Sequence, residues 1–138
     1  MQFTLDLKKL AKQVASIEDI ALKNDWQLKY DVELDSLYYS PDNIPSSYSL
    51  FSICDEFAVY VDKNSNVGGV LIEYYKSNLT SHDLKFKTFK QIFIEKNGNF
   101  TSIPKTLEDK AVLLKEVLKA EILSEIVKVN QDKQTIFA

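Results

Sequence analysis

The spacing of apolar and polar positions divides the chain into a helical beginning, a strand-rich middle and a helical end. Between Asp6 and Asn24, apolar residues recur every three or four positions, which places them on one face of an amphipathic helix. This stripe consists of Leu7, Leu10, Val14, Ile17 and Ala21. Asp6 is a suitable N-cap, because its carboxylate can accept from backbone N–H groups that lack a helical partner. The pattern predicts one helix over residues 6–24.

From Trp26 to Tyr75 the period changes to alternation, in segments rich in aromatic and β-branched residues, which is typical of strands. These segments are WQLKY, LDSLYY, FAVYVD and VGGVLIEYY. The segment SPDNIPSSYS contains Pro41 and Pro45, which do not fit a central strand, so it is predicted to be a loop. We therefore expect four or five antiparallel strands in this region.

The segment SHDLKFKTFKQIFIEKNG is ambiguous. Phe86, Phe89 and Phe93 fit one face of a helix, whereas Leu84, Phe86 and Thr88 alternate with lysines as in a strand. We favour a helix over residues 82–96. The last element is clearer, because Thr106 and Asp109 resemble a capping box ahead of a helical stripe. That stripe consists of Leu107, Ala111, Leu114, Leu118, Ile122 and Ile126.

These elements predict a single α+β domain over residues 1–138. An antiparallel β-meander of four or five strands is flanked by an N-terminal helix and C-terminal helices, and residues 131–138 form a loose tail. Both terminal helices carry an apolar stripe that must be covered, and one face of the sheet is the obvious partner.

Composition and charge exclude several classes of protein. No apolar run reaches the roughly 18 residues of a membrane span, and no secretory signal is apparent, so we expect a cytoplasmic protein without a membrane partner. One cysteine cannot form an internal disulfide. All 17 basic residues are lysine, the net charge is −3 and the pI is about 5.2, which disfavours binding to nucleic acid.

The segment VDKNSNVGGVLIE has the oxygen spacing of a helix-flanked calcium loop. The oxygen-bearing residues are Asp62, Asn64, Asn66 and Glu73. Val67, however, stands where such a loop needs glycine, and both flanks alternate like strands. We interpret the segment as a hairpin turn, with Gly68 or Gly69 at a bulge or a close backbone approach. Neither a metal site nor a cofactor is predicted.

Carboxylates and tyrosines supply the candidate binding residues. In an extended segment Asp31, Glu33 and Asp35 would share one face and could bind a ligand or cation, whereas in a turn Asp31 and Asp35 would accept from the local backbone. The pairs Tyr38–Tyr39 and Tyr74–Tyr75 place aromatic side chains on both faces of the predicted sheet. Tyrosine is enriched at protein interfaces, so both pairs are candidate contacts to a partner.

Part of this region resembles a small uncharacterised family, catalogued as domain of unknown function 2283. The resemblance covers residues 30–75 and departs from the family at Val32, where members usually have proline. The matching positions are Tyr30, Asp31, Glu33, Asp35, Leu37, Tyr38, Val61, Asp62, Asn66, Gly69, Ile72 and Glu73. It implies a compact β-sheet unit and no known activity.

Catalytic chemistry has little support in the sequence. His82 precedes Asp83, which would suit a general base oriented by a carboxylate in a hydrolase, but no second histidine exists. Asp55 and Glu56 disfavour a thiolate at Cys54. We therefore predict no catalytic residues.

The expected function is a non-catalytic protein-interaction or regulatory module, such as an adaptor or a small acidic immunity-type protein that masks its partner. The expected partner is another protein or a second copy of the chain. The alternatives are a small-molecule or metal-binding domain and a hydrolase.

Overall fold

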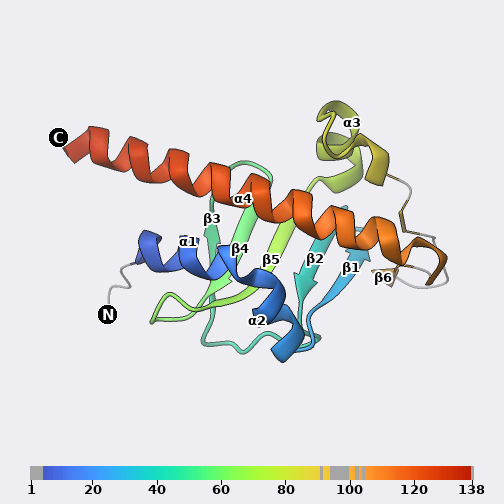
Figure 1. Cartoon of the computed structure of the whole chain (residues 1–138), viewed down its shortest axis with the longest axis horizontal. Helices are drawn as coiled ribbons and strands as arrows, with labels where there is room; N and C mark the ends of the chain where they lie inside the picture. The colour runs from blue at the N-terminus through green and yellow to red at the C-terminus, as the bar shows by residue number, and fades with distance from the viewer. Residues whose placement is uncertain (1–4, 91, 94–99, 102, 104, 138) are drawn as a thin grey trace.

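The computed structural model consists of one antiparallel sheet with helices over one of its faces (Figure 1). It describes residues 5–90, 92–93, 100–101, 103 and 105–137. The predicted α+β class is confirmed, with an N-terminal helical pair, an antiparallel sheet and a long C-terminal helix.

The N-terminal segment forms two helices and not one. Helix α1 spans Leu7–Ala15 and helix α2 spans Ile17–Lys23. The prediction of a single helix over residues 6–24 is wrong at Ser16, whose backbone (φ −107°, ψ 24°) ends α1 and begins α2. The predicted cap is confirmed, because the Asp6 carboxylate accepts from the Lys9 N–H at 3.1 Å.

The sheet contains five strands from the middle of the chain and one short strand from its C-terminal half. They are β1 Gln27–Asp31, β2 Ser36–Ser40, β3 Ser49–Ser52, β4 Phe57–Val61, β5 Val67–Glu73 and β6 Phe100–Thr101. All pairings are antiparallel, and the spatial order is β3-β4-β5-β2-β1-β6. The order departs from a simple meander at two places, since β2 pairs with β5 and β1 pairs with β6. The loop before β3 leads to the far edge of the sheet.

The segment after β5 does not form the helix that we expected over residues 82–96. It contains a π-helical turn η1 (Tyr75–Leu79), one turn of α-helix α3 (Thr80–His82) and a 3-10 turn η2 (Lys87–Phe89). Residues 91 and 94–96 lie outside the described residues. The three phenylalanines that fit one face of the expected helix are nevertheless all buried. They are Phe86, Phe89 and Phe93.

Helix α4 (Glu108–Phe137) follows the 3-10 turn η3 (Lys105–Leu107) and crosses the sheet obliquely (Figure 1). Its predicted stripe is buried from Ala111 to Ile126, with Leu114 fully enclosed, whereas Leu107 lies in η3 and is only partly buried. The helix continues through Phe137, so residues 131–137 are helical where a loose tail was expected, and Ala138 lies outside the described residues.

The core lies between the helices and the sheet face toward them. Helices α1, α2 and α4 contribute their stripes, and α1 packs along α4. At one end of this layer the Tyr30, Tyr75 and Phe93 rings contact one another, with centroids 5.5 to 5.9 Å apart. None of the helices in the described ranges is both long and apolar enough to cross a membrane.

Candidate interaction surface

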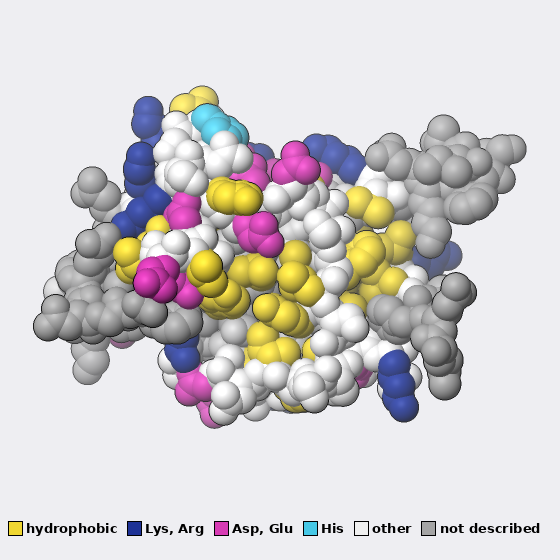
Figure 2. Space-filling model, turned by 180° about the vertical axis from the view of Figure 1, so that it is seen from behind, with side chains coloured by type: hydrophobic (Ala, Val, Ile, Leu, Met, Phe, Trp, Pro, Cys, Tyr) yellow, Lys and Arg dark blue, Asp and Glu magenta, His cyan; other side chains and the backbone are white. Residues whose placement is uncertain are grey.

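The second face of the sheet carries no helix in the part of the chain that the structure describes (Figures 1 and 2). Strand registers arrange its side chains in rows, because alternate residues of each strand point to the same face. One row runs across Asp31, Ser36 and Glu73, and the next across Lys29, Tyr38, Leu71 and Ala58. The third row runs across Gly69, Tyr60 and Leu50. Apolar and aromatic side chains therefore form the middle of this face (Figure 2).

One member of each tyrosine pair is buried. Strand alternation explains this for Tyr38 and Tyr39 in β2, whereas Tyr74 and Tyr75 lie beyond the end of β5. Tyr38 and Tyr74 are at least partly exposed, whereas Tyr39 and Tyr75 are buried. Tyr38 lies on the uncovered face. Tyr74, 54% exposed, follows the end of β5 with a left-handed backbone (φ 56°).

The buried member of each pair belongs to the core. Tyr39 stacks edge-on against Trp26 with centroids 5.3 Å apart, and burial, followed by the charge of Glu18, raises its pKa to about 12. The Tyr75 hydroxyl donates to the Phe89 carbonyl at 2.8 Å, and burial raises the pKa of Tyr75 strongly. In this structure neither ring is available to a partner without opening the core.

The carboxylates of the YDVELD segment bind the local backbone, which corresponds to the turn alternative. Asp31 Oδ1 accepts from the Glu33 and Leu34 N–H groups at 3.0 and 3.2 Å. Asp35 holds the turn to the start of η1. Its Oδ1 accepts from the Tyr30 hydroxyl (2.5 Å) and the Lys76 N–H (2.8 Å), and its Oδ2 accepts from the Ser77 N–H (2.9 Å) and hydroxyl (2.6 Å).

The electrostatics of Asp35 follow from these bonds. Partial burial acts to raise its pKa, but hydrogen bonds from Ser77, Tyr30 and Lys76 outweigh that effect and hold the pKa below its usual range. The residue has a positive φ of 51°, which aspartate tolerates better than most side chains. Asp35 therefore acts as a structural anchor between the β1–β2 turn and η1.

The segment with calcium-loop spacing is a hairpin turn between β4 and β5, as predicted. Asp62 Oδ1 accepts from the Asn64 and Asn66 N–H groups at 2.9 Å, and Oδ2 accepts from the Asn66 amide at 3.0 Å. Glu73 lies at the other end of β5. Within the described ranges, no three His, Cys, Asp or Glu side chains are grouped to hold a metal ion.

The tip of this hairpin is fixed to helix α1 by side chains. Gln13 donates to Asn66 Oδ1 at 2.8 Å and accepts from the Val67 N–H at 2.6 Å, and Lys9 donates to the Asn64 carbonyl at 2.7 Å. The predicted bulge is present, since the register shifts between Tyr60 and Val61.

Both glycines lie where another backbone or ring approaches closely. A Cβ on Gly69 would lie 2.8 Å from the Ser40 Cβ and 3.3 Å from the Tyr60 ring. A Cβ on Gly68 would collide with the Tyr48 ring. The Tyr60 ring can thus lie close to the backbone of β5.

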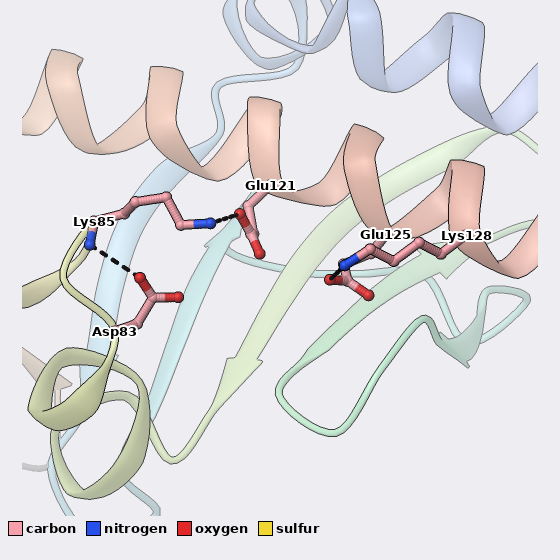
Figure 3. A network of polar contacts seen from close by, with 5 residues as sticks. All are labelled: Asp83, Lys85, Glu121, Glu125 and Lys128. Carbon is pink, nitrogen blue, oxygen red and sulfur yellow. Dashed lines mark hydrogen bonds and ion pairs between the residues drawn. The ribbon is translucent and has the colours of Figure 1, made fainter.

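The groups considered for catalysis are not brought together. His82 Nε2 lies 2.5 Å from Asn78 Oδ1, while Asp83 accepts from the Lys85 N–H at 2.9 Å. Lys85 pairs with Glu121 of α4, so this segment is tied to the long helix (Figure 3). Burial raises the pKa of Cys54, which disfavours its thiolate.

A shallow recess of about 460 Å³ borders the uncovered face. It lies beside Tyr38 and is lined by Lys29, Ser40, Pro41, Asp42 and Ile44. Lys29 forms an ion pair with Asp42 there. Loop residues after β2 thus form one wall of the uncovered surface.

Sequence reasoning named Tyr38 but missed Tyr60, Leu71 and Leu50, which share its face. The signal was present in FAVYV, because Tyr60 is out of phase with the buried residues Val59 and Val61. Leu50 was missed because its strand, SLFS, is short and follows a loop rich in proline and serine.

Comparisons with protein-family models, with curated proteins and with solved structures found no match to this chain. The resemblance of residues 30–75 to domain of unknown function 2283 stays a prediction.

Proposed function

We propose that the chain is a non-catalytic protein-interaction module that binds a partner through the uncovered face of its sheet. The observation that carries this proposal is the distribution of helices, since α1, α2 and α4 all lie over the opposite face (Figure 1). A sheet face without helical cover that displays tyrosine and leucine side chains is typical of a binding surface.

The residues of the surface support this function. Tyr38 and Tyr60 are partly exposed, Leu50 is 47% exposed, and Leu71 and Ala58 form an apolar floor between them. Tyrosine combines a large apolar contact area with a hydrogen-bonding tip, so it can bind a partner while remaining soluble when unbound. The absence of an assembled His82–Asp83 pair among the described contacts favours binding over hydrolysis.

The test is affinity capture from extracts of the native host, with the tagged chain and two double variants compared side by side. The surface variant carries Leu50→Ser and Tyr60→Ser. The control carries Leu113→Ser and Val127→Ser on α4, where both side chains are 53% exposed. Circular dichroism and thermal unfolding confirm that each variant is folded before capture.

We expect a protein that the unmodified chain and the α4 control retain and that the surface variant loses. Capture that is equal with all three chains, or lost only with the α4 control, would refute binding through the uncovered face. Turnover of a substrate by the purified chain, abolished by His82→Gln, would favour the hydrolase alternative.

A further inference from the structure

The uncovered face is asymmetric in charge. Its middle row contains Tyr38 and Leu71, and the row beside it ends in the carboxylate of Glu73, opposite Ser36. Among the described residues, Lys29 is the only basic residue in these rows, and its ammonium group already forms an ion pair with Asp42. Acidic side chains border the apolar patch (Figure 2). The balance at this border is therefore negative.

Glu73 is the carboxylate most available to a partner. Asp31 is buried and its Oδ1 binds the turn backbone, whereas the partly exposed Glu73 side chain forms no hydrogen bond or ion pair with other described residues. Glu73 also lies within electrostatic reach of the partly exposed Tyr38 and Tyr60. Burial first, and then nearby charges that include Glu73, raises the pKa of Tyr38 and of Tyr60.

The Tyr38 and Tyr60 rings and the Leu71 side chain form an apolar site beside this charge. The Tyr60 ring packs close to Gly69. A side chain at position 69 would collide with Ser40. Leu71 is only 6% exposed, so it forms a floor. A long side chain with an apolar stem and a cationic end fits such a site, since the stem covers the rings and the end pairs with a carboxylate.

We propose that this surface binds a basic protein segment, in which an arginine or lysine lies over Tyr38 and Tyr60 and pairs with Glu73 while a neighbouring apolar side chain contacts Leu71. This inference rests on the proposed interaction function and adds the chemistry of the partner. The net charge of −3 supports it, because the field of the whole chain attracts a basic partner and repels an acidic one.

The experiment uses two synthetic pentapeptides that alternate leucine with either arginine or citrulline. Citrulline keeps the shape of arginine but has no charge. Each peptide is titrated into the isotope-labelled full chain, and binding is followed by NMR chemical shifts at low ionic strength. The same titrations are repeated with Glu73→Gln and with a control of equal charge, Glu116→Gln, whose site is an exposed position on α4.

We expect shifts centred on Tyr38, Tyr60, Leu71 and Glu73, and binding of the arginine peptide about tenfold tighter than that of the citrulline peptide. Glu73→Gln should remove most of this difference, and Glu116→Gln should leave it. Equal binding of both peptides on this face overturns the cationic preference but leaves the interaction function standing. Equal effects of the two variants, shifts on another surface, or no binding by either peptide also overturn the inference, whereas the interaction function is judged by the capture experiment.

Discussion

Replacing Asp35 by asparagine should destabilise the fold far more than the same change at Asp25. Both residues have a left-handed backbone, with φ of 51° at Asp35 and 54° at Asp25, and asparagine tolerates that conformation. Asp25 is exposed, and its side chain makes no hydrogen bond with the described residues. The pair of variants therefore separates the hydrogen bonds of Asp35 from any effect of backbone geometry or of the lost charge.

The expected magnitude follows from the four bonds to the Asp35 carboxylate. Asparagine keeps one oxygen and so retains two of the bonds. Its NH2 group replaces the second oxygen and faces the two donors that had bonded to that oxygen, so these two bonds are lost. Losing two bonds of about 1 kcal/mol each, at a partly exposed site, lowers the free energy of unfolding by about 2 kcal/mol. Asp25→Asn should change it by less than about 0.5 kcal/mol.

The cost of Asp35→Asn should also depend on pH. The pKa of Asp35 is lowered in the folded chain, so its ionised form contributes stability above the unfolded pKa of about 4, and this contribution is lost as pH falls through the folded pKa. Urea unfolding followed by circular dichroism measures the free energy of each chain at neutral and acidic pH. The difference between the unmodified chain and Asp35→Asn should shrink in acid. Equal costs for the two variants at neutral pH, or a difference that does not change in acid, would refute this reasoning.

Three further predictions concern single side chains. Gly69→Ala should lower the free energy of unfolding by about 1–3 kcal/mol, measured by urea unfolding, because its Cβ would lie 2.8 Å from the Ser40 Cβ. Gln13→Ala should cost about 1–2 kcal/mol in the same assay, and hydrogen exchange should become faster at the Asn66 end of the hairpin, since two bonds to that end are lost. Cys54 should react with a thiol reagent more slowly than free cysteine at mildly alkaline pH, because burial raises its pKa. A rate equal to that of free cysteine would contradict this.

Helical spacing predicted most of the side chains that α1, α2 and α4 bury. The stripe of α1 and α2 is buried from Leu10 to Ala21 and partly buried at Leu7, even though Ser16 divides it into two helices. The spacing gives the direction of the side chains and not the continuity of the backbone. For the same reason Phe86 and Phe89, which fit one face of a helix that does not form, are both buried. Hydrophobic spacing fits both a helix and a series of tight turns.

The order of the strands in the sheet and the hydrogen-bond partners of distant polar residues could not be predicted from the sequence. A period of two gives the face on which Tyr38 lies, but any strand of similar length could pair with β2, and β5 does so through contacts distant along the chain. The four bonds of Asp35 depend on the position of Ser77, far away in the sequence. Asp62, in contrast, binds groups within its own turn. The turn could therefore be predicted from one local segment, through Val67 at the position where a calcium loop needs glycine and through the strand-like flanks.

The strand order has a consequence for how the protein folds. Two parts of the sheet are local in sequence, the β1–β2 hairpin and the β3-β4-β5 meander, and each can form by fast closure of a short turn. The ladder between β2 and β5 joins these parts, and it must close a much longer loop. Association of the two parts should therefore be the slow step, and the unpaired edges of β2 and β5 are exposed until it is complete. An aggregate formed during refolding would carry these two strands at its contacts.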